Sequence, residues 1–289
     1  MAELWEPIAG VFWKSVPLMP SWVSLSNFFD SPFFISLMGA LAGAYFGAWA
    51  AQRNAANNKL RDELLREIRS SNRGVMLGLS VINVALAMKR QHIAPLKYSY
   101  DEDLERLKQY KNAPAPRGVL EVSPMLMRLQ GMSSPVASLN QLLLDQSSGK
   151  AHRAIMALIE ATDNLNASIN LRNSILNNIK SGDFPKGFKF EDLYFGLPVD
   201  GNVNNEYGDT VKAIFLYCDD VVFFALKTCE YLKDHGERCS SRYKRLSREE
   251  IRICSVDMKV ASEAGLLPDE KNYESWLAGY SESNDTAKT

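Results

Sequence analysis

The chain of 289 residues lacks the short motifs that reveal an enzyme's chemistry. It contains no GxxxxGK[ST], GxGxxG, GxSxG or HExxH, the patterns of phosphate loops, dinucleotide folds, serine hydrolases and zinc peptidases. Its 33 Lys and Arg nearly balance its 34 Asp and Glu, so no overall charge points to nucleic acid or to an acidic partner. We therefore predict no catalytic residue and no cofactor, and nucleic acid as a partner is unsupported.

Cysteine and histidine are scarce and widely spaced. Four cysteines stand in the last quarter of the chain without any CxxC pair, and three histidines are far apart in sequence. These residues are Cys218, Cys229, Cys239 and Cys254, and His92, His152 and His235. Zinc sites need closely spaced ligands of these types, so no metal site is predicted. Free thiols agree with a reducing compartment.

Charge is absent from residues 32–51, and this gap is the clearest signal in the sequence. The stretch FFISLMGALAGAYFGAWAAQR (33–53) predicts a transmembrane helix over 32–52, because about 20 apolar residues span a bilayer. A cleaved export signal is one alternative, since Ala48 and Ala50 fit a cleavage site. However, a signal peptide starts with positive charge, and the preceding residues carry a net −2 (Lys14 against Glu3, Glu6 and Asp30). A buried soluble helix is the other alternative, but it would show a polar edge.

The flanking charges predict an orientation. Residues 53–72 carry five basic side chains, whereas residues 12–31 carry only Lys14. Because positive charge stays on the cytoplasmic side, we expect a single-pass protein of the inner (plasma) membrane with the N-terminus outside and the C-terminal part in the cytosol. Residues 1–31 are rich in Trp and Phe and are expected to lie at the membrane interface.

Three glycines recur once per helical turn inside the apolar stretch. Small residues let transmembrane helices approach closely, so the span is expected to self-associate into a homo-oligomer. The packing face comprises Gly39, Gly43 and Gly47 with Ala40, Ala44 and Ala48 beside them. The alternative is that small residues are simply common in membrane helices and face lipid here.

The remaining chain is expected to be all-α. Residues 53–73 predict a basic stalk helix with a break at 70–74, and residues 74–268 predict a cytosolic antiparallel helical bundle. The uncharged run 75–88 is short for a span, so a buried core helix is expected there. A second membrane segment at 75–88 is the alternative and would reverse the topology of the residues after it.

Within the bundle, helices are expected at 101–112, in one or two short pieces at 124–147, at 150–179 and at 212–233, with a linker at 113–118. Residues 150–179 have an apolar seam whose odd member is Arg172, expected to reach the helix edge or to pair with a carboxylate. The aromatic, irregular loop 181–208 is the first choice for a binding surface. LYCDDVV (216–222) resembles the paired-aspartate element of reverse-transcriptase palms, but its helical period excludes that function.

Basic residues gather in the stalk and again at 238–248. The predicted contacts to phosphate or lipid headgroups are Arg53, Lys59, Arg61, Arg238, Arg242, Lys244 and Arg245. A capping box from Ser247 to Glu250 predicts a further helix that runs to Ala264 and is closed by Gly265 and Pro268. Residues 269–289 are expected to form an acidic flexible tail.

Together these features predict a membrane-anchored, non-enzymatic protein that self-associates through its span and binds or senses a cytosolic partner, as a membrane effector or scaffold. The alternative is a membrane-tethered helical module that binds nucleic acid or anionic lipid through its basic residues. An enzyme built on the 181–208 loop is a third, weaker hypothesis.

Overall fold

The computed structural model describes residues 32–116, 118–133, 138–139, 141–142 and 149–279. Within these ranges the chain forms helices and no β-strand, so the all-α prediction is confirmed. The interfacial segment predicted for residues 1–31 and the last ten residues of the predicted tail lie outside the described residues. The chain divides into two compact units, residues 1–60 and 61–289.

The described part of the first unit is a single stretch of helix α2 (Pro32–Met88). Near the N-terminus α2 is long and apolar enough to cross a membrane, judged by length and composition alone, and no other such helix occurs among the described residues. Large apolar side chains in this stretch are exposed, including Ile35, Leu41, Tyr45, Phe46 and Trp49. The chain therefore has one long apolar helix near its N-terminus.

Helix α2 runs without interruption through residues 70–74, so the predicted break is wrong. The small residues there serve helix packing instead. Ser71 and Gly74 are buried, and a Cβ added to Gly74 would lie 2.5 Å from the Leu232 side chain of α7 (Glu206–Ser247). Polar and small residues that suggest a turn thus let a second helix approach closely.

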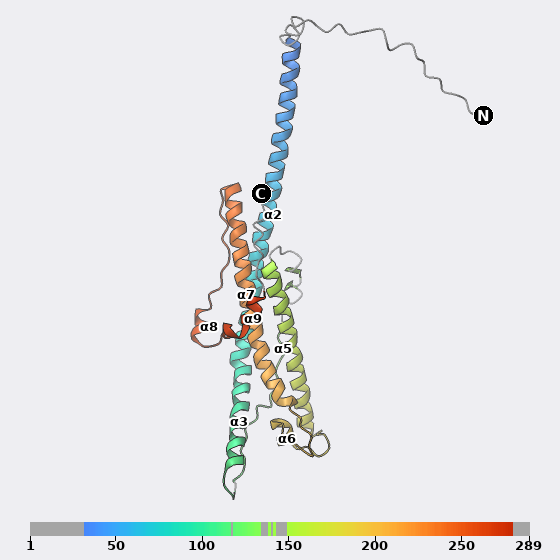
Figure 1. Ribbon diagram of the computed structural model, residues 1–289, viewed down its shortest axis with the longest axis vertical. Coiled ribbons are helices and arrows are strands. Elements are labelled where there is room, and N and C mark those ends of the chain that lie inside the picture. Colours follow the sequence, from blue (N-terminus) through green and yellow to red (C-terminus); the bar gives the residue numbers. More distant parts are fainter. Residues whose placement is uncertain (1–31, 117, 134–137, 140, 143–148, 280–289) are drawn as a thin grey trace, which may run out of the picture. The chain divides into compact units, whose positions relative to one another are not determined.

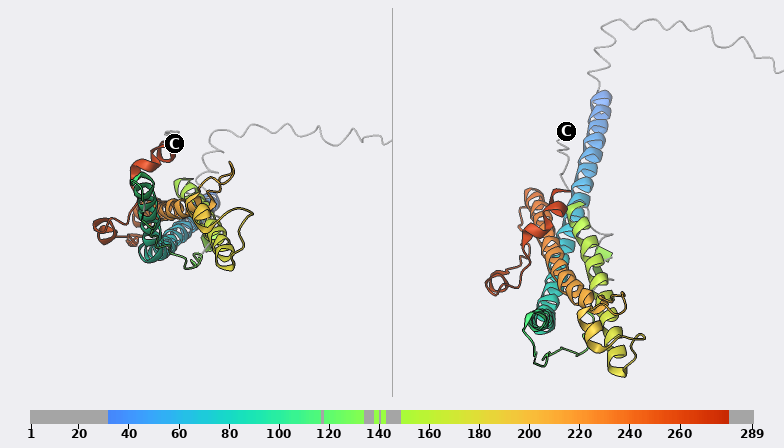
Figure 2. Two further views of the ribbon diagram at one scale, coloured as in Figure 1. Left: turned by 90° about the horizontal axis from the view of Figure 1, so that it is seen from below. Right: turned by 60° about the horizontal axis from the view of Figure 1, so that its bottom comes forward.

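The second unit is built around three long helical stretches: α2 from Arg61, α5 (Gly149–Ser181) and α7. Helices α5 and α7 lie side by side and run in opposite directions (Figures 1 and 2). All eight residues of the predicted 150–179 seam are buried, from Ile155 to Ile179. The helix predicted at 212–233 is confirmed and extends to Ser247.

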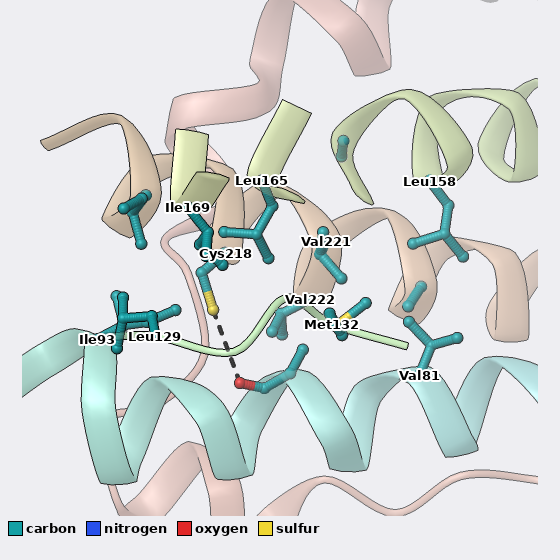
Figure 3. Packing of buried hydrophobic residues seen from close by; sticks show 14 of the residues in the cluster. Val81, Ile93, Leu129, Met132, Leu158, Leu165, Ile169, Cys218, Val221 and Val222 are labelled. Carbon is teal, nitrogen blue, oxygen red and sulfur yellow. Dashed lines mark hydrogen bonds between the residues drawn. The ribbon is translucent and has the colours of Figure 1, made fainter. Parts of the chain in front are cut away.

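Residues 75–88 form part of this core, as predicted. Val75, Val81, Ile82 and Ala85 are buried. The Cys218 thiol lies 3.6 Å from the carbonyl oxygen of Ala85 (Figure 3), and the Cys229 thiol lies 3.5 Å from that of Val75. These contacts pack the α2 run directly against α7.

A five-residue π-helix, η1 (Lys89–Ile93), joins α2 to α3 (Ala94–Asn112). Pro95 stands in the first turn of α3 and has no amide hydrogen to continue an α-helical ladder. Just before Pro95, the Ala94 amide bonds back to the carbonyl of Lys89, five residues earlier, in the π pattern. The polar helix predicted at 101–112 is confirmed, and it begins earlier than predicted.

Residues 118–133 are irregular, so the short helices predicted from 124 are wrong for this stretch. We call residues 119–133 the strap. Its main chain bonds to side chains of α5: the Asn173 amide group both donates to and accepts from Leu129, and Asn166 does the same with Met132. These paired bonds replace those of a helix, in the manner of a neighbouring β-strand. Leu129 and Met132 point into the core (Figure 3).

The helix predicted from Ser247 to Ala264 is also wrong. Arg248 adopts a left-handed conformation (φ 62°) and ends α7, and only α8 (Lys259–Glu263) is helical over the rest of that range. Half-buried residues alternate with exposed ones over 254–258, a period of two that suits an extended chain. Gly265 follows α8 with φ 65°, in keeping with its predicted closing role.

Residues 270–278 form η2 (Glu270–Tyr273) and α9 (Glu274–Ala278). Tyr273 is buried and stacks on Phe223 of α7 with ring centroids 3.7 Å apart. The flexible tail predicted from Asp269 is therefore wrong for its first part, because aromatic packing fixes it to α7.

Candidate functional site

The predicted packing face on α2 has no partner among the described residues. A Cβ added to Gly39, Gly43 or Gly47 would meet nothing within 4 Å. By contrast, a Cβ at Gly74, Gly78 or Gly236 would press on side chains of the second unit. Ala40, Ala44 and Ala48 are exposed beside the first three glycines. The small residues of the apolar stretch thus serve no packing that the structure describes.

The structure brings one part of the predicted basic set together. Helices α2 and α7 are antiparallel where they touch: the Arg61 guanidinium donates to the carbonyl of Leu246, and His235 Nε2 lies 3.0 Å from Glu67 Oε2. Arg61 therefore lies beside the last turns of α7, which carry the exposed Arg238, Arg242, Lys244 and Arg245. Arg53 and Lys59 belong to the first unit. We call residues 61–69 and 238–248 together the basic end of the second unit.

Part of this basic charge has a structural role. Lys244 pairs with Glu250 at 2.6 Å, and Lys244 and Arg245 stand in the last turn of α7, where cations offset the helix dipole. Sequence reasoning missed a groove of about 460 Å³ on α2 that is lined by Arg66, Arg69 and Arg73. Their spacing of three and four residues puts them on one helix face, and this spacing is the sequence pattern from which the groove could have been predicted.

Asp219 and Asp220 lie half-buried in α7, which confirms that LYCDDVV is helical. Lys89 Nζ lies 2.5 Å from Asp219 Oδ1 and donates to the carbonyl of Leu266 at 2.8 Å. The Tyr273 hydroxyl donates to Asp220 at 2.8 Å. Burial raises the pKa of both carboxyls, an effect that Lys89 opposes at Asp219 and Tyr273 opposes at Asp220. These aspartates hold the C-terminal residues on α7.

No group of three His, Cys, Asp or Glu that could hold a metal occurs among the described residues. His235 contacts both Glu67 and Cys239, but through the same Nε2 atom (3.0 and 3.5 Å). A relay needs the two ring nitrogens to take different partners. Burial also raises the pKa of the Cys239 thiol, which disfavours the thiolate that a nucleophile requires. The contact between His235 and Glu67 joins α7 to α2.

Arg172 takes neither of its predicted positions. Its side chain is fully buried and donates to two strap carbonyls, those of Met125 (2.7 Å) and Met127 (3.0 Å). Its guanidinium also lies 5.7 Å from the centre of the Tyr207 ring. The physical reason is that the irregular strap has main-chain acceptors without helical partners. Arg172 is therefore a structural clamp.

The 181–208 loop packs through its aromatic residues. Tyr194 and Phe195 of α6 (Phe190–Phe195) are buried, and the Tyr194 hydroxyl donates to the buried Asp103 at 2.9 Å. Burial is the largest cause that raises the pKa of Tyr194, and the hydrogen bond to Asp103 is the second. At the end of the loop, a shallow cavity of about 520 Å³ is lined by Leu171, Val203 and neighbouring polar residues. Two acidic side chains, Glu206 and Asp209, are among the residues that line it.

Comparisons of the chain with protein-family models, with curated proteins and with solved structures find no match.

Proposed function

We propose that the chain is a non-enzymatic, single-pass membrane protein that self-associates through residues 32–52 and presents an antiparallel helical bundle to a cytosolic partner. The observation that carries the proposal is the apolar stretch of α2. In the most apolar 18 residues of this helix, no residue is buried. Exposed side chains such as Ile35 (62%), Tyr45 (69%) and Phe46 (64%) form a surface too apolar for water. A bilayer covers such a helix on all sides.

Self-association is proposed from the contrast between the two sets of glycines. In the second unit, glycines occur where another helix packs closely, whereas Gly39, Gly43 and Gly47 have free space around them. Because lipid supplies no hydrophobic drive between helices, close backbone approach at such residues is a main source of their association. A second copy of the chain is therefore the proposed neighbour on this face, and the assembled copies act as a membrane effector or scaffold.

Replacing Gly39, Gly43 and Gly47 together by isoleucine is expected to weaken self-association by about tenfold or more, since the branched side chains hold the backbones apart. Isoleucine keeps the helix apolar, so membrane insertion persists. Energy transfer between two labelled pools of full-length chain in vesicles, measured against the protein-to-lipid ratio, gives the association constant.

The matched control replaces Leu37, Leu41 and Tyr45 by isoleucine. These exposed residues are spaced like the glycines and are displaced by two positions, about 200° around the helix. Energy transfer should then remain near the wild-type value. Equal association of the glycine variant and the control would overturn the proposed packing face.

The orientation is proposed from the basic end of the second unit. Arg61 follows Ala51 by ten residues, so the chain can separate them by at most about 35 Å. Antiparallel packing of α2 and α7 adds the exposed bases of 238–248 to those of 61–69. This basic end suits the cytosolic leaflet, where anionic headgroups attract Lys and Arg. Anionic lipid is thus favoured over nucleic acid as the partner of these residues.

Cys254 offers a direct test of orientation, because it is half-buried while the other three cysteines are buried. A membrane-impermeant maleimide is expected to label the chain only after the cells are permeabilised. Cys254→Ser should abolish that labelling and serves as the control. In a separate test of anchorage, alkaline extraction should leave the chain in the membrane fraction. Labelling of Cys254 in intact cells would reverse the orientation, and recovery in the soluble fraction would refute membrane anchorage.

A further inference from the structure

A cavity of about 590 Å³ lies between α7 and the C-terminal segment 256–270. Phe223, Leu226 and Cys229 of α7 form one wall, and Val256, Met258 and Leu267 form the other. We call it the C-terminal cavity and call residues 255–265 its cover. Its volume falls within the range of small-molecule sites, about 300–1,000 Å³.

The cover is fixed at both ends by buried or half-buried groups. On one side, the Asn72 amide group accepts from the Cys254 amide at 2.8 Å and donates to the carbonyl of Arg252 at 3.2 Å. On the other, Lys89 Nζ holds the carbonyl of Leu266, and Tyr273 bonds to Asp220. Between these anchors the cover carries α8, whose Val260 is 80% exposed. The fold thus holds the cover over α7 by its two ends.

The walls of the cavity are apolar and its charged rim is balanced. Lys227 lies 2.9 Å from Glu230 of α7 and 2.6 Å from Glu270 of η2. With Lys233, the rim carries two positive and two negative side chains. Burial raises the pKa of the Cys229 thiol to about 12, so the thiol stays neutral. A charged ligand would find no net opposite charge among these lining residues.

We propose that the C-terminal cavity binds an uncharged, largely apolar small molecule, and that binding fixes the cover against α7. Such a ligand adds contacts to both walls at once, so it stabilises the closed cover relative to a released one. This inference goes beyond the proposed function.

The test uses the full-length chain in lipid nanodiscs and an uncharged trifluoromethyl phenyl diazirine as the probe. After photolysis, mass spectrometry maps the labelled peptides, with labelling of residues 32–52 as the reference for probe dissolved in lipid. We expect saturable labelling within residues 223–233 and 256–268. A phenyl diazirine that carries a carboxylate should label them less.

Leu226→Trp fills the cavity from α7 and is expected to lower this labelling about tenfold. Met258→Trp fills it from the cover and decides the outcome if circular dichroism shows that Leu226→Trp is unfolded. Val260→Trp, on the exposed part of the cover, should label like the wild type. Absence of saturable labelling in both peptides, equal labelling of the filled and control variants, or preference for the charged probe would overturn the proposal.

Discussion

Replacing Arg172 by methionine is expected to lower the free energy of unfolding by about 3 kcal/mol, because two main-chain carbonyls lose a charged donor. The guanidinium lies 2.7 and 3.0 Å from the carbonyl oxygens of Met125 and Met127. Methionine retains part of the buried volume but donates no hydrogen bond. Chemical denaturation of the full-length chain in detergent, followed by far-UV circular dichroism, measures the loss.

Arg128→Met is the matched control, since Arg128 belongs to the same strap and is exposed. Its effect should stay within about 0.5 kcal/mol. Tryptic cleavage after Arg128 gives a local readout for Arg172→Met: a strap that has lost its clamp should be cut faster than in the wild type. If the two variants are equally stable and the cleavage rate is unchanged, Arg172 does not clamp the strap.

Replacing Lys89 by methionine is expected to cost about 3–5 kcal/mol near neutral pH, because it leaves the Asp219 carboxylate without its buried partner. The two side chains are 7% and 17% exposed and lie 2.5 Å apart. The variant also loses the bond from Lys89 to Leu266, which anchors the C-terminal residues. Chemical denaturation of the full-length chain measures the cost, and the double variant Lys89→Met/Asp219→Leu should lose less than the single one.

The pH dependence of this loss has a definite sign. Burial raises the pKa of Asp219 above its usual value of 3.8, and Lys89 opposes the rise. Without Lys89 the folded state holds the Asp219 proton more tightly than the unfolded state does. Stability is then present below the unfolded pKa and is lost as the pH rises through the folded pKa. The Lys89→Met deficit should therefore be smaller near pH 4 than near pH 7; a deficit that does not change with pH would contradict the buried-pair argument.

Local periodicity was enough to predict the two longest helices of the second unit. The α5 seam and the buried stripe of α7 repeat every three or four residues, and such a pattern is a property of each helix alone. The uncharged run 32–51 is equally local, because the absence of charge needs no knowledge of neighbours. The membrane hypothesis, the glycine face and the absence of a known catalytic motif all derive from these local patterns.

The strap and the chain beyond Arg248 could not be predicted in this way. Both segments have side chains that also fit short helices, and their conformation is fixed by amide groups elsewhere in the sequence. Asn166 and Asn173 bind the strap, and Asn72 binds residues 252–254. Since these partners are 34 to 182 residues away, no local window contains the information.

The features of the candidate site also differ in whether a local pattern or a long-range contact determines them. The sequence by itself determined an apolar helix with three glycines in register, because composition and spacing settle both. Only the tertiary structure decided that Arg61 lies beside the end of α7, that Lys89 meets Asp219, and that the C-terminal residues cover a cavity. Each of these contacts joins residues that are distant in the chain, because α2, η1 and the C-terminal residues all pack against α7.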